Sequence, residues 1–171
     1  VIMPSSAQSI FESYSYAITK YKGPVISLEH RVLYDLKFKI GATKSVNPFK
    51  PRLVKKGTDL TIIATSIMVW ESMRAIKMIE RNFPLSIELI DLHCISKCDK
   101  SLLLRSIKKT KKVIVVDTSW KEFGVASEIS RLICENIPNL LEKPLISVCN
   151  QATPCPTSKK LENYFYPSVQ E

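Results

Sequence analysis

Residues 111–135 read KKVIVVDTSWKEFGVASEISRLICE, and this stretch decides the fold. The run from Val113 to Val116 is entirely β-branched, which is too short for a buried helix and typical of a strand covered on both faces. Asp117 is predicted to end that strand. After Gly124 the apolar residues recur with helical spacing and form one stripe: Val125, Ile129, Leu132 and Ile133. The stretch therefore predicts a buried strand, a short loop and an amphipathic helix.

The segment between this strand and this helix carries two aromatic residues. Trp120 and Phe123 lie among polar residues in a predicted loop from Thr118 to Phe123. The loop follows the carboxyl end of a strand, which is the edge where open α/β sheets place ligands or partners. Two large rings in so short a loop need apolar cover. We therefore expect both rings to pack against a partner subunit, a neighbouring domain or the local core.

The start of the following helix is predicted to lie beside the two aromatic rings. Gly124 begins the helix and Glu128 lies one turn into it. A carboxylate at this position can act at a site, or it can simply stabilise the positive end of the helix. We include Gly124 and Glu128 with Trp120 and Phe123 in a predicted subunit or partner interface.

The first thirty residues predict one helix and one strand. Ser5 or Ser6 is suited to cap a helix that continues to about residue 20. Its predicted apolar face consists of Ile10, Tyr14, Ala17 and Ile18. A Gly-Pro pair ends the helix, and residues 25–29 predict a buried strand. One helix and one strand cannot form a core, so residues 1–30 are expected to be the tail of a domain whose body lies upstream.

Residues 31–57 form an irregular basic segment. Eight lysines and arginines stand against Asp35 alone between residues 31 and 56. No helical or alternating period persists, which favours an interdomain linker with room for one edge strand. A basic strip can face nucleic acid, an acidic partner or water. Because few aromatic residues, such as Phe38 and Phe49, interleave the charges, we predict no nucleic-acid binding.

From residue 58 onward, strands and helices alternate to the end of the chain. Strands are predicted at residues 60–64, 86–92, 113–116 and 145–149. Helices are predicted to begin at a cap formed by Thr65 or Ser66, at a cap formed by Asp99, after Gly124, and at residue 159. Helical crossovers between successive strands imply a mostly parallel sheet with helices on both faces. Residues 58–171 therefore predict an α/β domain.

The overall composition excludes several classes of protein. The 171 residues are 45% hydrophobic and 24% charged, with a net charge of +9, which is typical of a globular chain. No apolar run approaches the roughly 20 residues that span a bilayer, and the first residues do not resemble a signal peptide. Five cysteines without CxxC spacing favour reduced thiols in a cytosolic protein. We therefore predict a cytoplasmic protein that binds no membrane.

The sequence offers little that could carry chemistry. It contains only four glycines and lacks both GxGxxG and GxxxxGK[ST], so a phosphate-binding loop is not expected. His93, Cys94 and Cys98 lie close together, but His30 is the only other histidine and a zinc site needs about four ligands. Neighbouring side chains of an extended segment point to opposite faces, which argues against a catalytic Cys/His pair at residues 93–94. We predict no catalytic, cofactor-binding or metal-binding residue.

Five segments, taken in order, resemble the second half of the β subunit of thiamine diphosphate-dependent 2-oxo-acid dehydrogenases. They read VIMPSSAQSIFESYSYAI, GPVISLEHRVLYD, KKGTDLTIIATSIMVWESM, IELIDLHCISKCD and SIKKTKKVIVVDTSWKEFGVASEI. The resemblance covers almost the whole chain. The motifs MPSS, LEHRVLY and VVDTSWKEFG favour the pyruvate or branched-chain type. The same architecture also occurs in transketolase and in deoxyxylulose phosphate synthase.

The resemblance implies a fold and a division of the chain. Residues 1–30 would finish a pyrimidine-binding domain, and residues 31–57 would be the interdomain linker. Residues 58–171 would form a transketolase C-terminal domain. This is a three-layer α/β/α sandwich with a mostly parallel, five-stranded mixed sheet.

The resemblance also implies cofactors and partners. The parent enzyme would use thiamine diphosphate and Mg²⁺, but this fragment would bind neither, because the family's cofactor-activating Glu, stacking aromatic and active-site His precede the matched region. A homodimer or an α2β2 heterotetramer with an α subunit is implied, with docking to an acyltransferase core. Glu142 aligns with an acidic position that receives the basic acyltransferase binding domain in some relatives.

The chain departs from the family's usual sequence at several places. Residues 91–93 read Asp-Leu-His where the family has Asp-Leu-Arg, and residues 66–67 read Ser-Ile where it has Ser-Arg. Residues 150–157 lack the acid and the tyrosine of the family segment Gly-Ala-Asp-x-Pro-x-Pro-Tyr. Lys20 and Lys22 occupy the loop where some relatives hold a potassium ion. These departures favour a second hypothesis, a stand-alone assembly or regulatory module without chemistry.

Overall fold

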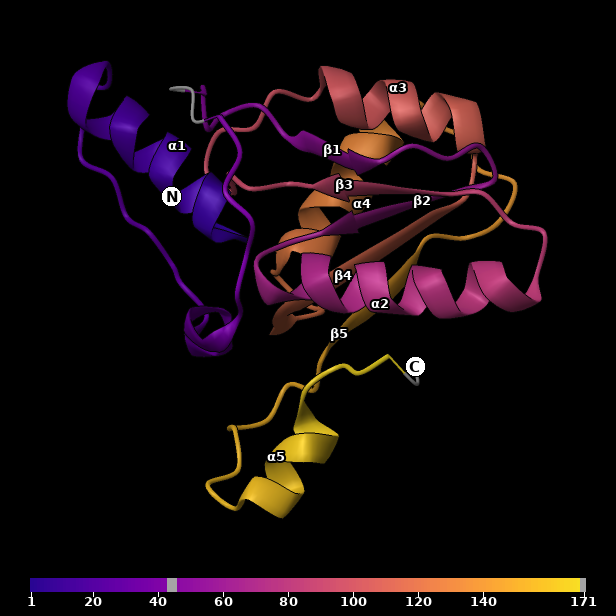
Figure 1. The fold of residues 1–171 in the computed structure, drawn as a ribbon. Helices are drawn as coiled ribbons and strands as arrows, with labels where there is room; N and C mark the ends of the chain where they lie inside the picture. Colours follow the sequence, from indigo (N-terminus) through magenta and orange to yellow (C-terminus); the bar gives the residue numbers. More distant parts are fainter. Residues whose placement is uncertain (43–45, 170–171) are drawn as a thin grey trace.

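A five-stranded sheet forms the centre of the computed structural model, which describes residues 1–42 and 46–169 (Figure 1). Residues 43–45 of the predicted linker and residues 170–171 of the predicted domain lie outside the described residues. The strands are β1 (Arg52–Lys55), β2 (Leu60–Ala64), β3 (Ile87–Asp91), β4 (Val113–Trp120) and β5 (Ile146–Asn150), in the spatial order β1-β3-β2-β4-β5. Only β1 is antiparallel to its neighbour. The predicted mostly parallel mixed sheet is therefore confirmed.

Helices cover both faces of this sheet (Figure 1). One face packs on α2 (Ile67–Asn82), and the other packs on α3 (Ser101–Thr110) and α4 (Val125–Asn136). Neighbouring residues of β3 show the two layers, because Leu89 belongs to the α2 layer and Ile90 to the other, and both are fully buried. The predicted three-layer sandwich is confirmed.

The fourth strand is longer than predicted. Asp117 does not end it, because β4 continues to Trp120, which pairs with Asn150 of β5. The Asp117 carboxylate is buried, and it accepts hydrogen bonds from the hydroxyls of Thr65 and Ser119. These hydrogen bonds allow an acidic residue to remain inside the strand.

The predicted helix caps are partly confirmed. Ser6 caps α1 (Ala7–Thr19) and forms a capping box with Ser9. Asp99 accepts a hydrogen bond from the Ser101 amide at 2.9 Å, although the cap position itself is Lys100. The predicted cap position of α2 is confirmed at Ser66, but the Ser66 side chain makes no capping hydrogen bond. The Ser66 hydroxyl instead donates to the Pro4 carbonyl at 3.2 Å.

The apolar face predicted for α1 is wrong. Ile18 is 83% exposed and Tyr14 is also exposed, whereas the buried residues of the helix are polar: Ser9, Glu12 and Ser13. The predicted strand at residues 25–29 is also wrong, because among the described residues it makes only an isolated bridge between Ser27 and Ile2. A β-rich sequence forms a strand only where a neighbour offers a continuous ladder.

The predicted linker contains two elements. Strand β1 confirms the expected edge strand, and η1 (Arg31–Asp35) is a 3₁₀ helix that was not predicted. The chain ends with α5 (Lys159–Phe165), a short helix that projects from the body of the sandwich (Figure 1). All five cysteines are free. Within the described residues, no helix is both long and apolar enough to cross a membrane.

Candidate functional site

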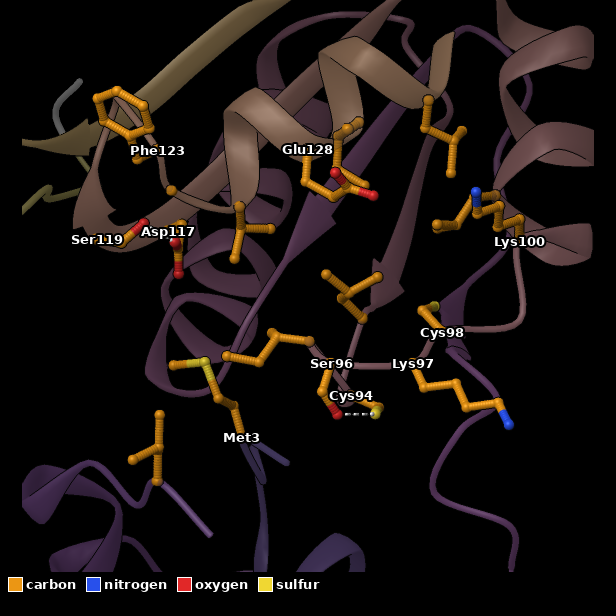
Figure 2. A pocket seen from close by; sticks show the side chains of 18 of the residues that line it. Met3, Cys94, Ser96, Lys97, Cys98, Lys100, Asp117, Ser119, Phe123 and Glu128 are labelled. Carbon is orange, nitrogen blue, oxygen red and sulfur yellow. Dashed lines mark hydrogen bonds between the residues drawn. The ribbon is translucent and has the colours of Figure 1, made fainter. Parts of the chain in front are cut away.

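An open cleft of about 860 Å³ lies at the carboxyl ends of the parallel strands (Figure 2). We call it the carboxyl-edge cleft. Apolar side chains, including Leu92, Leu103 and Ile129, line it, together with Lys97 and Lys100. The loop after β3 forms one side, and the β4–α4 turn with the first turns of α4 forms the other. The cleft therefore occupies the position where open α/β sheets bind ligands or partners.

Three residues with left-handed backbone lie at this edge. Ser66 has φ of 47°, His93 of 59° and Phe123 of 56°, and they follow β2, β3 and β4 respectively. Residues other than glycine rarely adopt positive φ because the Cβ atom crowds the backbone. Such strain persists only where the surrounding structure enforces it, and it is concentrated at functional sites. The strain therefore supports a functional role for this edge.

The two aromatic rings predicted to need cover are exposed here. The exposed fraction is 105% for Phe123, which excludes burial in the local core, and 51% for Trp120. Gly124 holds the turn closed, because a Cβ atom there would lie 2.1 Å from the Trp120 carbonyl oxygen and 2.3 Å from Ser119 Oγ. The turn thus presents an uncovered phenylalanine at the rim of the cleft.

The structure separates the two acidic residues of the predicted interface. Glu128 lines the carboxyl-edge cleft with Phe123 and Gly124, and a hydrogen bond from Arg131 holds the pKa of its carboxyl group below the usual value. Glu142 lies elsewhere, beside the start of β4, where its amide donates to the Lys111 carbonyl. Its carboxylate is 3.5 Å from the Lys112 Nζ atom. Glu142 therefore does not contribute to the cleft.

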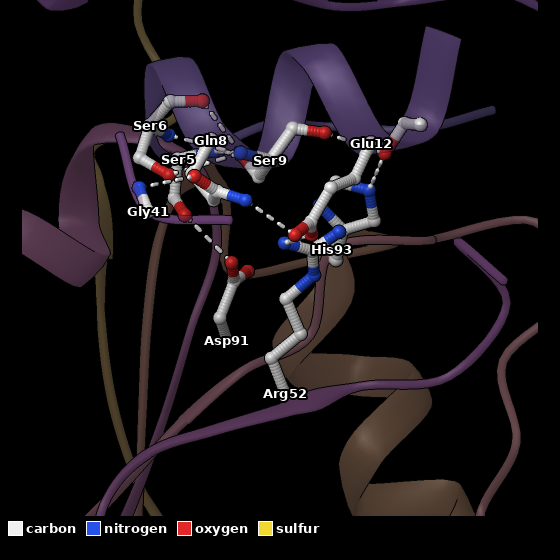
Figure 3. A network of polar contacts seen from close by, with 10 residues as sticks. Ser5, Ser6, Gln8, Ser9, Glu12, Gly41, Arg52, Asp91 and His93 are labelled. Carbon is white, nitrogen blue, oxygen red and sulfur yellow. Dashed lines mark hydrogen bonds and ion pairs between the residues drawn. The ribbon is translucent and has the colours of Figure 1, made fainter. Parts of the chain in front are cut away.

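A polar cluster outside the cleft joins α1 to the sheet (Figure 3). Ser5 Oγ donates to Asp91 Oδ2 at 2.6 Å, and Arg52 Nη1 donates to Glu12 Oε2 at 2.8 Å. Ser13 Oγ and His93 Nε2 are 2.7 Å apart. Four buried atoms of the cluster have no hydrogen-bond partner among the described residues: Arg52 Nε, Arg52 Nη2, Asp91 Oδ1 and His93 Nδ1. We call these residues the α1 cluster.

Burial sets the protonation of the α1 cluster. It raises the pKa of Asp91 to about 6, against the opposing effects of the Ser5 hydrogen bond and the Arg52 charge. It lowers the pKa of His93 to about 3, and the charge of Arg52 acts in the same direction. At neutral pH the cluster therefore holds a neutral imidazole beside an ionised carboxylate.

Ser13 and His93 have the spacing of a nucleophile and its base, but they cannot act as one. Both are 0% exposed, so no substrate reaches the hydroxyl. An imidazole with a pKa of about 3 is also a weak base at neutral pH. The pair therefore has a structural role, joining α1 to the end of β3.

The Cys98 thiol beside the cleft is not activated. Burial raises the pKa of Cys98 to about 12, so the thiol stays protonated. His93 points to Ser13 rather than to a cysteine. No group of three His, Cys, Asp or Glu side chains suited to a metal ion occurs within residues 1–42 and 46–169.

The comparison with protein families decides the classification. The family model described as "Transketolase, C-terminal domain" matches residues 50–171. This chain belongs to the transketolase C-terminal domain family. This is the domain family that the resemblance to dehydrogenase β subunits implied for residues 58–171.

Two relatives of this transketolase-family chain carry dehydrogenase or oxidoreductase names. The mitochondrial pyruvate dehydrogenase E1 component subunit beta of Saccharomyces cerevisiae is 28% identical over 174 residues, covering 99% of this chain and 47% of the relative. The acetoin:2,6-dichlorophenolindophenol oxidoreductase subunit beta of Cupriavidus necator is 28% identical over 149 residues, covering 86% and 44%. The chain thus spans about half the length of the relatives it matches, and the resemblance to dehydrogenase β subunits is confirmed.

A solved structure supports the fold. The chain described as "Split gene transketolase, inactive beta4 tetramer" superposes with a TM-score of 0.76 and 20% identity, covering 99% of this chain and 52% of that one. At this identity the likeness shows the transketolase-like fold alone.

Two features of the site could not be recognised from sequence. The left-handed residues at the carboxyl edge are not glycines, so no residue type marks them. The α1 cluster joins Ser13 to His93 across 80 residues of sequence. The Asp-Leu-His departure at residues 91–93 was the one available signal, because it places His93 at the end of β3.

Proposed function

We propose that this chain is the C-terminal half of the β subunit of a thiamine diphosphate-dependent 2-oxo-acid dehydrogenase of the pyruvate or branched-chain type. The observation that carries the proposal is the match of almost the whole chain to a pyruvate dehydrogenase E1 β subunit. The parent enzyme would decarboxylate a 2-oxo acid, and this half would supply subunit interface. An exposed aromatic turn beside a large cleft is the surface expected of that role.

The proposed domain division follows the sequence. Residues 1–30 would end a pyrimidine-binding domain, residues 31–57 would form the linker, and residues 58–171 would form the C-terminal domain. The exposed apolar residues of α1, Phe11, Tyr14 and Ile18, support a neighbour on the outer side of that helix. Strand β1 pairs with β3, so the end of the proposed linker contributes to the sheet.

The described residues do not fit a thiamine diphosphate and Mg²⁺ site. They gather no set of acidic or histidine side chains for a metal ion, and the four glycines form no phosphate-binding loop. We therefore assign no step of cofactor chemistry to this chain, and the chain alone is proposed to be inactive. The cofactor would be bound by other parts of the parent enzyme.

The proposed partners are a second β subunit and an α subunit, in a homodimer or an α2β2 heterotetramer. Trp120, Phe123, Gly124 and Glu128 would contribute to this interface. Glu142 would receive an acyltransferase binding domain, although its contacts with Lys111 and Lys112 reduce the negative charge that it presents. A cytoplasmic location remains a prediction, since the yeast relative is named mitochondrial.

Two alternatives have specific support. The matched family is described as the transketolase C-terminal domain, which is consistent with a transketolase-like or deoxyxylulose phosphate synthase-like enzyme. The sequence departures at residues 66–67, 91–93 and 150–157 favour a divergent assembly module without activity. Intact mass and peptide sequencing of the native polypeptide separate these hypotheses. A polypeptide that contains the Glu and His of a thiamine site supports an enzyme subunit, and one without them supports the module.

Replacing Phe123 with asparagine tests the proposed interface. We expect the Phe123→Asn variant to associate with the α subunit and with itself at least about tenfold more weakly, because a fully exposed ring in a rigid turn is typical of an energetic hot spot. Asparagine tolerates left-handed backbone, so the variant should unfold at or above the temperature of the unsubstituted chain. Co-purification and sedimentation velocity measure the association.

The matched control is Phe83→Asn, which removes another exposed phenylalanine. Phe83 is 58% exposed and follows α2, away from the carboxyl-edge cleft. Association should be unchanged in this variant. Unchanged association in Phe123→Asn, or an equal loss in both variants, would show that the β4–α4 turn is not the interface.

A further inference from the structure

A second groove, of about 420 Å³, lies between α3 and the edge strand β1. We call it the α3–β1 groove. It is lined by Leu53 of β1, the β1–β2 turn, the start of β3 and one face of α3. Nothing in the proposed interface uses this surface, so the inference below is independent of the proposed function.

The charge of the groove is strongly positive. Lys56, Arg105 and Lys109 line it, with Glu88 as the only acidic residue of the lining. Glu88 is buried and already satisfied, since it accepts from Lys109 Nζ at 2.5 Å, from Ser106 Oγ at 2.5 Å and from the Gly57 amide at 3.2 Å. Burial alone would raise the pKa of Glu88, but these three donors together lower it. The carboxylate therefore stays ionised and neutralises Lys109.

Two cations of the groove remain without an acidic partner. Lys56 and Arg105 are exposed, and neither makes an ion pair with any part of the chain that the structure describes. Two other lysines nearby are paired, since Lys55 contacts Glu80 at 2.7 Å and Lys112 contacts Glu142 at 3.5 Å. Lys56 and Arg105 are therefore the lining cations that remain available to an acidic ligand.

The groove also has an apolar component. Leu53 is 39% exposed, and Leu102 of α3 is partly buried against the core while it lines the same groove. No aromatic side chain lines the groove, although aromatic rings are the usual platforms for nucleic-acid bases. An apolar contact flanked by cations matches a peptide better than a nucleic acid.

We propose that the α3–β1 groove binds an acidic, leucine-containing segment of a partner protein. Carboxylates of the segment would contact Lys56 and Arg105, and an apolar side chain would lie between Leu53 and Leu102. Strand addition is not the binding mode, because β1 has four residues and a bulge between Leu53 and Lys55, which prevents a regular ladder. The segment is held by its side chains.

A labelled peptide tests the proposal. A fluorescein-labelled peptide of alternating glutamate and leucine should bind the full chain, and fluorescence anisotropy measures the affinity. Raising NaCl from about 0.05 M to about 0.3 M should weaken binding several-fold, because screening reduces contacts between exposed charges. The Lys56→Glu/Arg105→Glu variant should bind at least about tenfold more weakly. Lys109 is left unchanged because Glu88 depends on it.

The matched control is Lys39→Glu/Lys77→Glu, which changes the net charge by the same amount. Both lysines are exposed and neither lines the groove, so peptide binding should stay within about twofold of the unsubstituted chain. An equal loss of peptide affinity in the groove variant and in this control would show that net charge alone causes the effect. That result would overturn the assignment of the groove as the binding site.

Peptide and nucleic-acid competitors complete the test. A glutamate–serine peptide should bind more weakly than the glutamate–leucine peptide, because it lacks the apolar contact. Equal binding of the two peptides would overturn the leucine requirement. Binding of a single-stranded oligonucleotide without binding of the glutamate–leucine peptide would assign the groove to nucleic acid and overturn the proposal.

Discussion

Replacing Gly57 with alanine is expected to lower the free energy of unfolding by about 3 kcal/mol. A Cβ atom on Gly57 would lie 2.2 Å from the Ile87 carbonyl carbon and 2.3 Å from the Glu88 amide nitrogen. Backbone atoms of a strand cannot move aside as the end of a side chain can. The start of β3 would therefore have to shift relative to β2, and the Gly57 amide would lose its bond to Glu88. Urea denaturation followed by circular dichroism measures the loss.

Gly41→Ala is the matched control for this substitution. Among the described residues, nothing lies within 4 Å of a Cβ atom placed on Gly41, so the free energy of unfolding of this variant should change by less than about 0.5 kcal/mol. If Gly57→Ala were as stable as Gly41→Ala, the close approach of the β1–β2 turn to β3 would be disproved.

Replacing Asp91 with asparagine is expected to make the fold sensitive to acid. As the pH falls from about 6 to about 4, the Asp91→Asn variant should lose about 1 kcal/mol of stability per pH unit relative to the unsubstituted chain. Over this range the total loss is about 2 kcal/mol, from one buried carboxyl group. The reason lies in the opposite pKa shifts of Asp91 and His93.

The pKa of Asp91 is raised from 3.8 to about 6 on folding. Its contribution to stability is therefore complete below about pH 3.8 and is lost as the pH rises through about 6. The pKa of His93 is lowered from 6.5 to about 3. Its contribution is complete above about pH 6.5 and is lost as the pH falls towards 3. As the pH falls from about 6 to about 4, Asp91 therefore adds stability while His93 removes it. Without Asp91, only the loss caused by His93 remains.

Urea midpoints measured from pH 4 to pH 8 check this expectation, with Glu12 and Arg52 unchanged as the other charged groups of the α1 cluster. The His93→Gln variant should show the opposite trend, gaining stability relative to the unsubstituted chain as the pH falls. Asp35→Asn is the control, because the Asp35 side chain is exposed on η1 and makes no hydrogen bond or ion pair among the described residues. A parallel pH profile for Asp91→Asn and the unsubstituted chain would contradict the assigned protonation.

The sequence predicted the sandwich well because its signals are local. The β-branched run at residues 113–116 and the stripe of α4 each depend on a few neighbouring residues, and the structure places them in the core. Asp117 was misjudged because Thr65, which donates to it, lies 52 residues earlier. The buried face of α1 was predicted wrongly because periodicity identifies the apolar side of a helix but does not show which side packs against the sheet. In this structure the polar side packs there.

The site was predictable in position and not in detail. The carboxyl edge follows from the order of strands and helices, so Phe123 and Gly124 could be placed there. The positive φ of Phe123 could not be predicted, since phenylalanine is not a residue type that marks left-handed backbone. Glu142 was assigned to partner binding by resemblance alone, and the fold places it beside the lysines before β4.

The attachment of α1 to the sheet has a thermal consequence. The inner face of this helix carries Ser9, Glu12 and Ser13, so separating that face from the sheet hydrates polar rather than apolar atoms. Hydration of apolar surface dominates the heat-capacity change of unfolding, and this separation should contribute little to it. Cooling weakens apolar burial but not hydrogen bonding to the same extent. Near 0 °C the core of the sandwich should therefore loosen before α1 separates from the sheet.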